Sequence, residues 1–282
     1  MTSSHGARVR EIGERHPEWR PWLSVVNQSL SEAASERWQP LVPKLNERQH
    51  DSAPLLAGMT LALDAALVRR WAHELFAVAA GGGTEKLSAL KAVKLSESEA
   101  LALFESSLCQ DRTRLSAGAA EFAVDADAWE AVALLLPIPL LHACERKWST
   151  IEAPSWMAGY CRTCGAWPAL AEVRGIERSH YFRCGRCGGG WQAQCLLCPY
   201  CGMTDHEQLA SLMPENDAEN AVINVCKRCL GYVKTFTSLQ ARSGAAVMLD
   251  DLASVDFDVV ALEQGFKRPQ GLGYALNLTI TP

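Results

Sequence analysis

The chain has 282 residues, of which 48% are hydrophobic and 21% are charged, an ordinary balance for a globular protein. Its 27 basic and 32 acidic side chains give a net charge of −5, which excludes whole-chain attraction to nucleic acid or to anionic membranes. This length accommodates one large domain or two to three small ones.

The sequence predicts neither a membrane span nor a signal peptide. No apolar stretch reaches the roughly 18 residues that span a bilayer. Residues 131–143 come closest, but Pro137 and Pro139 interrupt them. The first twenty residues are rich in Arg and Glu and lack an apolar core. We therefore expect a cytoplasmic protein, in a compartment where thiols stay reduced.

Residues 1–153 are predicted to form an all-α domain, as an antiparallel bundle. Apolar residues recur at helical spacing over residues 18–34, so that one face would be buried. Residues 55–80 are rich in Ala and Leu and end at three consecutive glycines, a strong helix stop. No two-residue alternation competes with the helical pattern in this half.

Local signals mark further helix ends in the same half. Ser96 and Glu99 form the Ser-x-x-Glu pattern of a capping box, which opens a helix over 100–108. Asp125 or Asp127 can cap the next helix, and Pro137 ends or kinks it. These signals support the helical interpretation.

From about residue 159 onward, short segments are separated by Gly and Cys. Strands are predicted over 169–173, 180–183, 191–194, 222–225 and 233–239, and a last helix over 253–265. We divide this half into a first four-cysteine ribbon module (154–194), a second one (195–245) and a C-terminal helix and tail (246–282). Such small β segments lack a core of their own, and bound metal replaces it. The expected fold class is α+β and multi-domain.

Nine of the eleven cysteines lie between residues 161 and 229, which in a reducing compartment indicates metal binding. Eight of them form four Cys-x-x-Cys knuckles: Cys161/Cys164, Cys184/Cys187, Cys198/Cys201 and Cys226/Cys229. Two intervening residues allow a tight turn to direct both thiolates at one ion. We predict that the first two knuckles hold one metal ion and the last two hold another.

The remaining cysteines and the nearby histidines are assigned other roles. Cys195 forms an overlapping Cys-x-x-Cys with Cys198, but Pro199 and Gly202 favour the frame that starts at Cys198. Cys195 is therefore assigned as a spare thiol, and its exchange with a ligand stays open. Because eight cysteines fill two tetrahedra, His180 and His206 are assigned to packing or the surface. Cys109 and Cys144 are expected to be small buried hydrophobes.

The residues leave the metal open between zinc and rubredoxin-type iron, since both suit four sulfurs in a tetrahedron. A closed four-sulfur site has no open position for hydrolytic catalysis. The sequence also has no phosphate-binding loop, nucleophile elbow or His-Glu-x-x-His motif. We therefore expect no enzymatic activity.

The cysteine-rich half resembles the FdhE family, the accessory proteins of formate dehydrogenase maturation. The matching motifs are Cys161-x-x-Cys164-Gly165 with Pro168, Tyr181-x-x-Cys184-x-x-Cys187-Gly188 with Trp191, Cys198-Pro-Tyr-Cys201-Gly202, Cys226-x-x-Cys229-x-Gly231-Tyr232-x-Lys234, the run 250–254, and Glu263-x-Gly265-Phe266. The motifs cover about residues 155–268, and Cys195 departs from the pattern.

The resemblance implies a cytoplasmic assembly factor that binds the catalytic subunit of a respiratory formate dehydrogenase before export. It also implies rubredoxin-like metal ligation, with iron as one candidate, through the eight knuckle cysteines. In the family, the cysteine pairs are further associated with contact to the client enzyme.

Two functions of other classes stay open from the residues. The first is a rubredoxin-like electron carrier or thiol oxidoreductase, for which Cys195 is the obvious reactive group. The second is a nucleic-acid-binding zinc ribbon. It is disfavoured because residues 157–236 hold eight basic and seven acidic side chains, without the basic excess of a nucleic-acid surface. The residues do not specify an oligomeric state.

Overall fold

The structure is a computed structural model that describes residues 4–45, 53–150, 156–213 and 221–282. The chain divides into two compact units, each built from segments that are distant in sequence. The first, here the helical unit, combines Met1–Lys44, Gly58–Lys147 and Asn277–Pro282. The second, here the sheet unit, combines Leu45–Ala57 and Trp148–Leu276.

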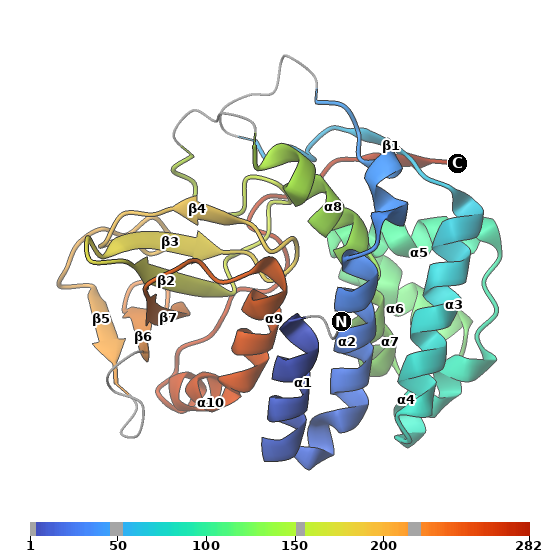
Figure 1. The fold of residues 1–282 in the computed structure, drawn as a ribbon, viewed down its shortest axis with the longest axis horizontal. Coiled ribbons are helices and arrows are strands. Elements are labelled where there is room, and N and C mark those ends of the chain that lie inside the picture. Colours follow the sequence, from blue (N-terminus) through green and yellow to red (C-terminus); the bar gives the residue numbers. More distant parts are fainter. Residues whose placement is uncertain (1–3, 46–52, 151–155, 214–220) are drawn as a thin grey trace. The chain divides into compact units, whose positions relative to one another are not determined.

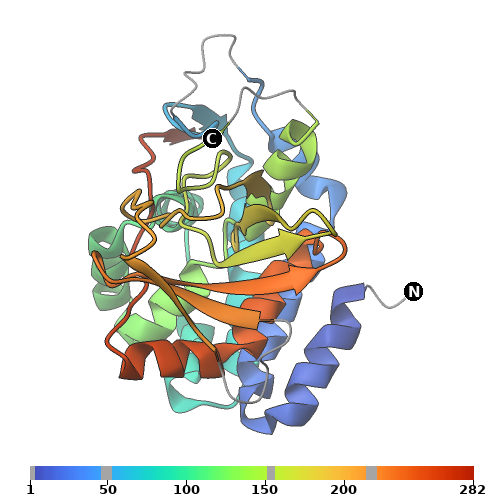
Figure 2. The ribbon, with the colours of Figure 1, turned by 90° about the vertical axis from the view of Figure 1, so that its left-hand side faces the viewer.

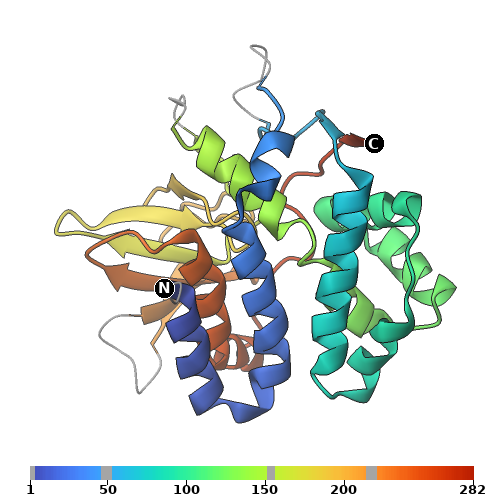
Figure 3. The same ribbon diagram turned by 45° about the vertical axis from the view of Figure 1, so that its right-hand side comes forward.

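The helical unit consists mainly of α-helices joined by short loops (Figures 1 and 3). Its elements are α1 (Ser4–Arg15), η1 (Pro17–Trp19), α2 (Arg20–Ala33), η2 (Glu36–Leu41), β1 (Thr60–Ala62), α3 (Ala65–Gly81), α4 (Glu85–Ser88), η3 (Ala89–Ala92), α5 (Glu97–Cys109), α6 (Arg112–Glu121), α7 (Ala126–Ala133), α8 (Ile138–Trp148) and β8 (Thr279–Thr281). Figure 3 shows α1 and α2 side by side. Large aromatic side chains such as Trp38, Trp71, Phe104 and Trp129 are buried in the core of this unit.

Two of the helix starts predicted from capping residues are present in the structure, with the expected side-chain hydrogen bonds. Ser96 and Glu99 form both hydrogen bonds of the capping box at the start of α5, and the Asp125 carboxylate accepts the N–H of Ala128 at the start of α7. The helix predicted over 55–80 begins only at Ala65. Preceding residues alternate, with Leu61 and Leu63 buried and their neighbours exposed, so they form strand β1, which pairs in parallel with β8.

Residues Ala126–Trp148 have the length and hydropathy of a membrane-crossing helix, which the sequence interpretation did not anticipate. In the structure, 72% of their most apolar stretch is buried inside the protein. Such burial is typical of a core helix, since its apolar side chains are already removed from solvent.

The sheet unit is built on one six-stranded sheet with the order β4-β3-β2-β7-β6-β5. The strands are β2 (Leu170–Arg174), β3 (Ser179–Arg183), β4 (Gly190–Gln192), β5 (Leu209–Leu212), β6 (Ala221–Cys226) and β7 (Tyr232–Ser238). Neighbours are antiparallel, except for the parallel pair β2 and β7 that joins the strands of the two cysteine-rich segments. All five predicted strands are present, whereas β5 was not predicted.

Two helices, α9 (Gly244–Ala253) and α10 (Val255–Glu263), cover one face of this sheet (Figure 2). Ile223 and Val225 of β6 pack against Phe257 and Ala261 of α10. The helix predicted over 253–265 corresponds to α10, whereas α9 was not predicted. The two helices meet at Ser254, whose hydroxyl donates to the carbonyl of Asp250 at 2.6 Å.

The α+β fold class is confirmed, with a helical N-terminal part and two four-cysteine clusters in ribbon-like turns. The finer division into 1–153, 154–194, 195–245 and 246–282 stays a prediction. Its first boundary, between 153 and 154, lies outside the described residues.

Candidate metal centres

All four knuckles share one backbone turn. The N–H of the residue after the second cysteine donates to the carbonyl of the first, in Gly165→Cys161, Gly188→Cys184, Gly202→Cys198 and Leu230→Cys226, at 2.8–3.1 Å. The first cysteine's own N–H donates to the residue five positions on. The residue after the second cysteine has a positive φ, and this residue is glycine in three of the knuckles. In the fourth knuckle it is Leu230, at φ 57°.

The first centre brings Cys161, Cys164, Cys184 and Cys187 together from the turn before β2 and the turn after β3. The Cys161 and Cys187 sulfurs are 3.4 Å apart, and those of Cys164 and Cys184 are 3.5 Å apart. Backbone N–H groups of Arg186 and Gly189 donate to the sulfurs of Cys184 and Cys187 at 3.4 Å. All four cysteines are buried, at 0–2% exposure.

Two other segments of the sheet unit cover this centre. The N–H of Leu55 donates to the carbonyl of Arg162 at 2.7 Å, and the N–H of Tyr274 donates to Gly165 at 3.0 Å. The cover is tight, because a Cβ added at Gly165 would lie 2.8 Å from the Tyr274 carbonyl. Tertiary structure therefore seals the first centre from solvent.

A buried ion pair also supports the first centre. Arg183, which precedes Cys184, donates to the carboxylate of Glu172 at 2.9 Å and to the carbonyl of Gly188 at 3.0 Å. Glu172 is fully buried and also binds Arg174 at 2.5 Å. The guanidinium thus connects the second knuckle to the centre of the sheet.

The second centre brings Cys198, Cys201, Cys226 and Cys229 together from the loop before β5 and the turn after β6. The Cys198 and Cys229 sulfurs are 3.6 Å apart, and those of Cys201 and Cys226 are 3.7 Å apart. Cys201 is exposed and Cys229 is partly exposed. A Cβ added at Gly202 would meet nothing within 4 Å, so this centre lies open at the surface.

Both clusters favour a bound cation. In the first, hydrogen bonds from Cys161 and its neighbours hold the pKa of Cys184 well below its ordinary value, while burial raises the pKa of Cys161. In the second, burial raises the pKa of Cys198. Burial also acts to raise the pKa of Cys226, but backbone N–H groups of Cys229 and Arg228 bring it below the ordinary value. Further thiolates would repel one another unless a cation balances them.

The sulfur geometry fits such a cation. Four sulfurs at about 2.3 Å from one ion in a tetrahedron lie about 3.8 Å apart, close to the spacing in both clusters. Within each cluster every sulfur lies within 4.8 Å of the others. The two clusters could therefore hold two metal ions, and zinc and iron suit this donor set equally.

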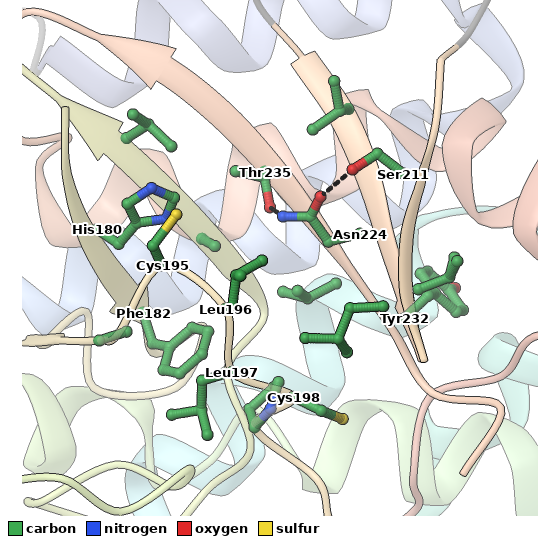
Figure 4. A pocket seen from close by; sticks show the side chains of 18 of the residues that line it. His180, Phe182, Cys195, Leu196, Leu197, Cys198, Ser211, Asn224, Tyr232 and Thr235 are labelled. Atoms are coloured by element: carbon green, nitrogen blue, oxygen red, sulfur yellow. Dashed lines mark hydrogen bonds between the residues drawn. The ribbon is translucent and has the colours of Figure 1, made fainter. Parts of the chain in front are cut away.

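The other sulfur and imidazole groups lie away from these clusters. The Cys195 side chain points toward His180, whereas the Cys198 sulfur points to the opposite side (Figure 4). His206 is exposed beside Asp205, Cys144 is buried, and Cys109 is partly buried. Neither histidine belongs to the clusters that the described residues form.

Sequence reasoning missed the buried charges behind the centres. Lys234 of β7 is fully buried and pairs with Asp251 and Asp258, each at 2.8 Å. Arg183 and Glu172 form the corresponding pair beside the first centre. The sequence shows only that Lys234, Arg183 and Glu172 lie within predicted strands. It does not reveal which face of the strand is buried, and therefore does not identify these charges as buried.

The fold and the two clusters define a class: a protein with a helical unit and a sheet unit, the latter with two four-cysteine clusters of the rubredoxin or zinc-ribbon type that could hold two metal ions. Residues 194–274 match the family described as FdhE, C-terminal domain. A solved structure, the crystal structure of the FdhE protein from Pseudomonas aeruginosa, has the same fold, with a TM-score of 0.58 and 22% identity over 96% of this chain and 94% of that chain.

Curated relatives give the same family. The protein FdhE homolog of Aquifex aeolicus is 29% identical over 131 residues, 45% of each chain. The homolog of Stutzerimonas stutzeri is 29% identical over 125 residues, which are 43% of this chain and 38% of that protein. The homolog of Pectobacterium atrosepticum is 32% identical over 111 residues, which are 39% of this chain and 35% of that protein. The alignments span less than half of each relative. The resemblance predicted from the motifs is confirmed: the chain is similar to FdhE proteins, and residues 194–274 match the family's C-terminal domain.

Proposed function

We propose that this protein is a cytoplasmic accessory factor for a respiratory formate dehydrogenase, and that it binds the catalytic subunit of that enzyme during maturation. The observation that carries the proposal is the pair of four-cysteine clusters, each with enough sulfur atoms to complete a tetrahedron, within a fold shared with FdhE proteins. The eight knuckle cysteines hold two ions, iron or zinc, as structural and docking elements. A closed tetrahedron leaves no position for substrate, which supports a binding role without catalysis.

The open second centre supports a role in docking. Cys201 and Gly202 lie at the surface, so a partner can contact this knuckle without unfolding the sheet unit. The first centre is buried and serves to hold strands β2 and β3 in place. We assign client contact to the second knuckle pair for this reason.

Affinity capture of the tagged chain from its own cells, with oxygen excluded and mass spectrometric identification, tests this function. Cys198→Ser removes a ligand of the second centre, and Cys195→Ser is the matched control, since it changes a nearby cysteine outside both clusters. We expect a formate dehydrogenase catalytic subunit with the wild type and Cys195→Ser, and at least tenfold less of it with Cys198→Ser. Capture of nucleic acid, or equal recovery with all three proteins, would contradict the proposal.

One observation favours a second candidate, rubredoxin-like electron transfer. An exposed cysteine at a four-sulfur iron site places the metal close to the surface, where electrons can pass to a partner. Iron in the isolated protein with a reversible colour change on reduction would support this function. Capture of reductases in place of a formate dehydrogenase would favour it over the first.

A further inference from the structure

The face of the sheet opposite α9 and α10 carries a groove with a volume of about 450 Å³ (Figure 4). Strand alternation places it there, because Ile223 and Val225 pack on α10 while Val222 and Asn224 of the same strand face the other side. We call it the sheet groove; its floor includes Val173, His180, Phe182, Val222, Asn224 and Thr235. All of its lining residues belong to the sheet unit.

The sheet groove combines an apolar floor with a short row of neutral polar groups. Ser211 donates to the Asn224 side-chain oxygen at 2.8 Å, and the Asn224 amide donates to the Thr235 hydroxyl at 2.8 Å. Thr235 is only 3% exposed. Its hydroxyl hydrogen has no acceptor in the part of the chain that the structure describes. The floor thus offers one unused donor, which a ligand oxygen can satisfy.

The charges along the sheet groove are of one sign. Arg178 and His180 line one end, and none of the described lining residues is acidic. Burial, followed by the charge of Arg178, lowers the pKa of His180, and Arg178 is the permanent charge at this end. Among the described lining residues, a cationic ligand would therefore find no carboxylate to pair with, whereas an anionic group could pair with the Arg178 guanidinium.

Residues 195–197, which lie between β4 and β5, form a wall of the sheet groove. Leu196 is 50% exposed and projects over the floor between Thr235 and Leu197, and the Cys195 thiol lies beside His180 (Figure 4). An apolar molecule inserted here would cover Leu196 and remove its side chain from water, which is favourable. The volume is within the range of small-molecule sites, about 300–1,000 Å³.

We propose that the sheet groove is a binding site for a small amphipathic organic anion. Its apolar body lies between Leu196 and the floor formed by Val173 and Phe182. Its acidic group lies at the Arg178 end, and an oxygen of the ligand accepts the Thr235 hydroxyl. This inference does not rest on the proposed function, and Cys198 and Cys226 of the second centre also line the sheet groove.

A matched pair of fluorescent molecules tests the site on the metal-loaded full-length protein. Anilinonaphthalene sulfonate has an apolar body and one anionic group, and N-phenyl-1-naphthylamine has the same body without the charge. We expect both to bind at one site per chain, the anionic one more tightly. Val222→Trp, which fills the floor, should weaken both by about tenfold or more, or about 1.4 kcal/mol per factor of ten.

Charge variants separate this site from unspecific apolar binding. Arg178→Gln should weaken the sulfonate about threefold and leave the neutral molecule unchanged, as for one exposed ion pair. Lys227→Gln, which removes a charge outside the sheet groove, is the control and should change neither. Equal affinity of the two molecules, or equal effects of Arg178→Gln and Lys227→Gln, would overturn the anionic assignment.

The Cys195 thiol gives a measurement on the wild-type protein that does not depend on the folding of any variant. Of the three cysteines outside the metal centres, it is the exposed one. Saturating sulfonate should slow its alkylation by iodoacetamide at least threefold, measured by peptide mass spectrometry. An unchanged rate at saturation would show that the molecule binds elsewhere and would contradict the proposal.

Discussion

The two candidate metal centres each consist of four cysteines on the same kind of backbone turn, yet they differ in what surrounds them. The first is covered by Leu55 and by Tyr274 and is backed by the buried pair Arg183–Glu172. The second leaves Cys201 and Gly202 at the surface. Identical local chemistry can therefore serve different ends, because burial controls which solutes and partners reach the sulfur atoms.

The largest contrast is expected between Cys184→Ser and Cys201→Ser. Each removes one sulfur ligand, and structural metal in such small modules provides folding free energy on the order of 10 kcal/mol. Cys184→Ser should lose the first ion and unfold the sheet unit, since β2 begins and β3 ends beside this centre. Cys201→Ser should lose the second ion and retain β2, β3 and β4. Metal content and thermal unfolding followed by near-ultraviolet circular dichroism distinguish them; equal losses would remove the contrast.

The ion pair behind the first centre gives the next largest effect. Arg183→Met leaves the Glu172 carboxylate buried beside fewer cations, which should lower the free energy of unfolding by about 3 kcal/mol. Arg228→Met, on an exposed knuckle position of the second centre, is the matched control with an expected change near zero. Denaturant unfolding of both metal-loaded variants checks this, and a loss of similar size in the two would show that Arg183 is not special.

Chelator competition compares the centres without mutation. Because water and chelator reach Cys201 but not the buried sulfurs, the second ion should leave at least about tenfold faster than the first. Native mass spectrometry over time should show a one-ion intermediate. The helical unit should keep its helical circular dichroism throughout. Simultaneous release of both ions would indicate that the two centres open together.

The smallest effect concerns the residue after the second cysteine of each knuckle, whose backbone is in the left-handed region. Leu230 is 46% exposed and has a positive φ, so Leu230→Gly should stabilise the sheet unit by about 1 kcal/mol through relief of backbone strain. Gly202→Ala, at the equivalent and open position, should destabilise it by a similar amount. Thermal unfolding of this pair measures both signs, and a loss with Leu230→Gly would show that its side-chain contacts outweigh the strain.

Much of the local structure followed from local patterns. The capping box at Ser96, the cap at Asp125 and five of the strands depend on neighbouring residues and were predicted correctly. The helix expected from residue 55 was wrong over its first ten residues, because Leu61 and Leu63 have a two-residue period and pair with the distant β8. Strand β5 was missed because only its pairing with β6 identifies it.

The sequence by itself identified the eight knuckle cysteines through their Cys-x-x-Cys spacing, with a glycine after the second cysteine in three of the four knuckles. It also predicted which knuckles pair, because consecutive knuckles lie at the spacing of ribbon modules, and the structure brings the same cysteines together. Only the tertiary structure decided that the strands beside both centres join in one sheet, that Arg183 and Lys234 are buried, and that the first centre is sealed and the second open. Burial of a sulfur depends on segments as distant as residues 55 and 274, and such contacts have no signature in the local sequence.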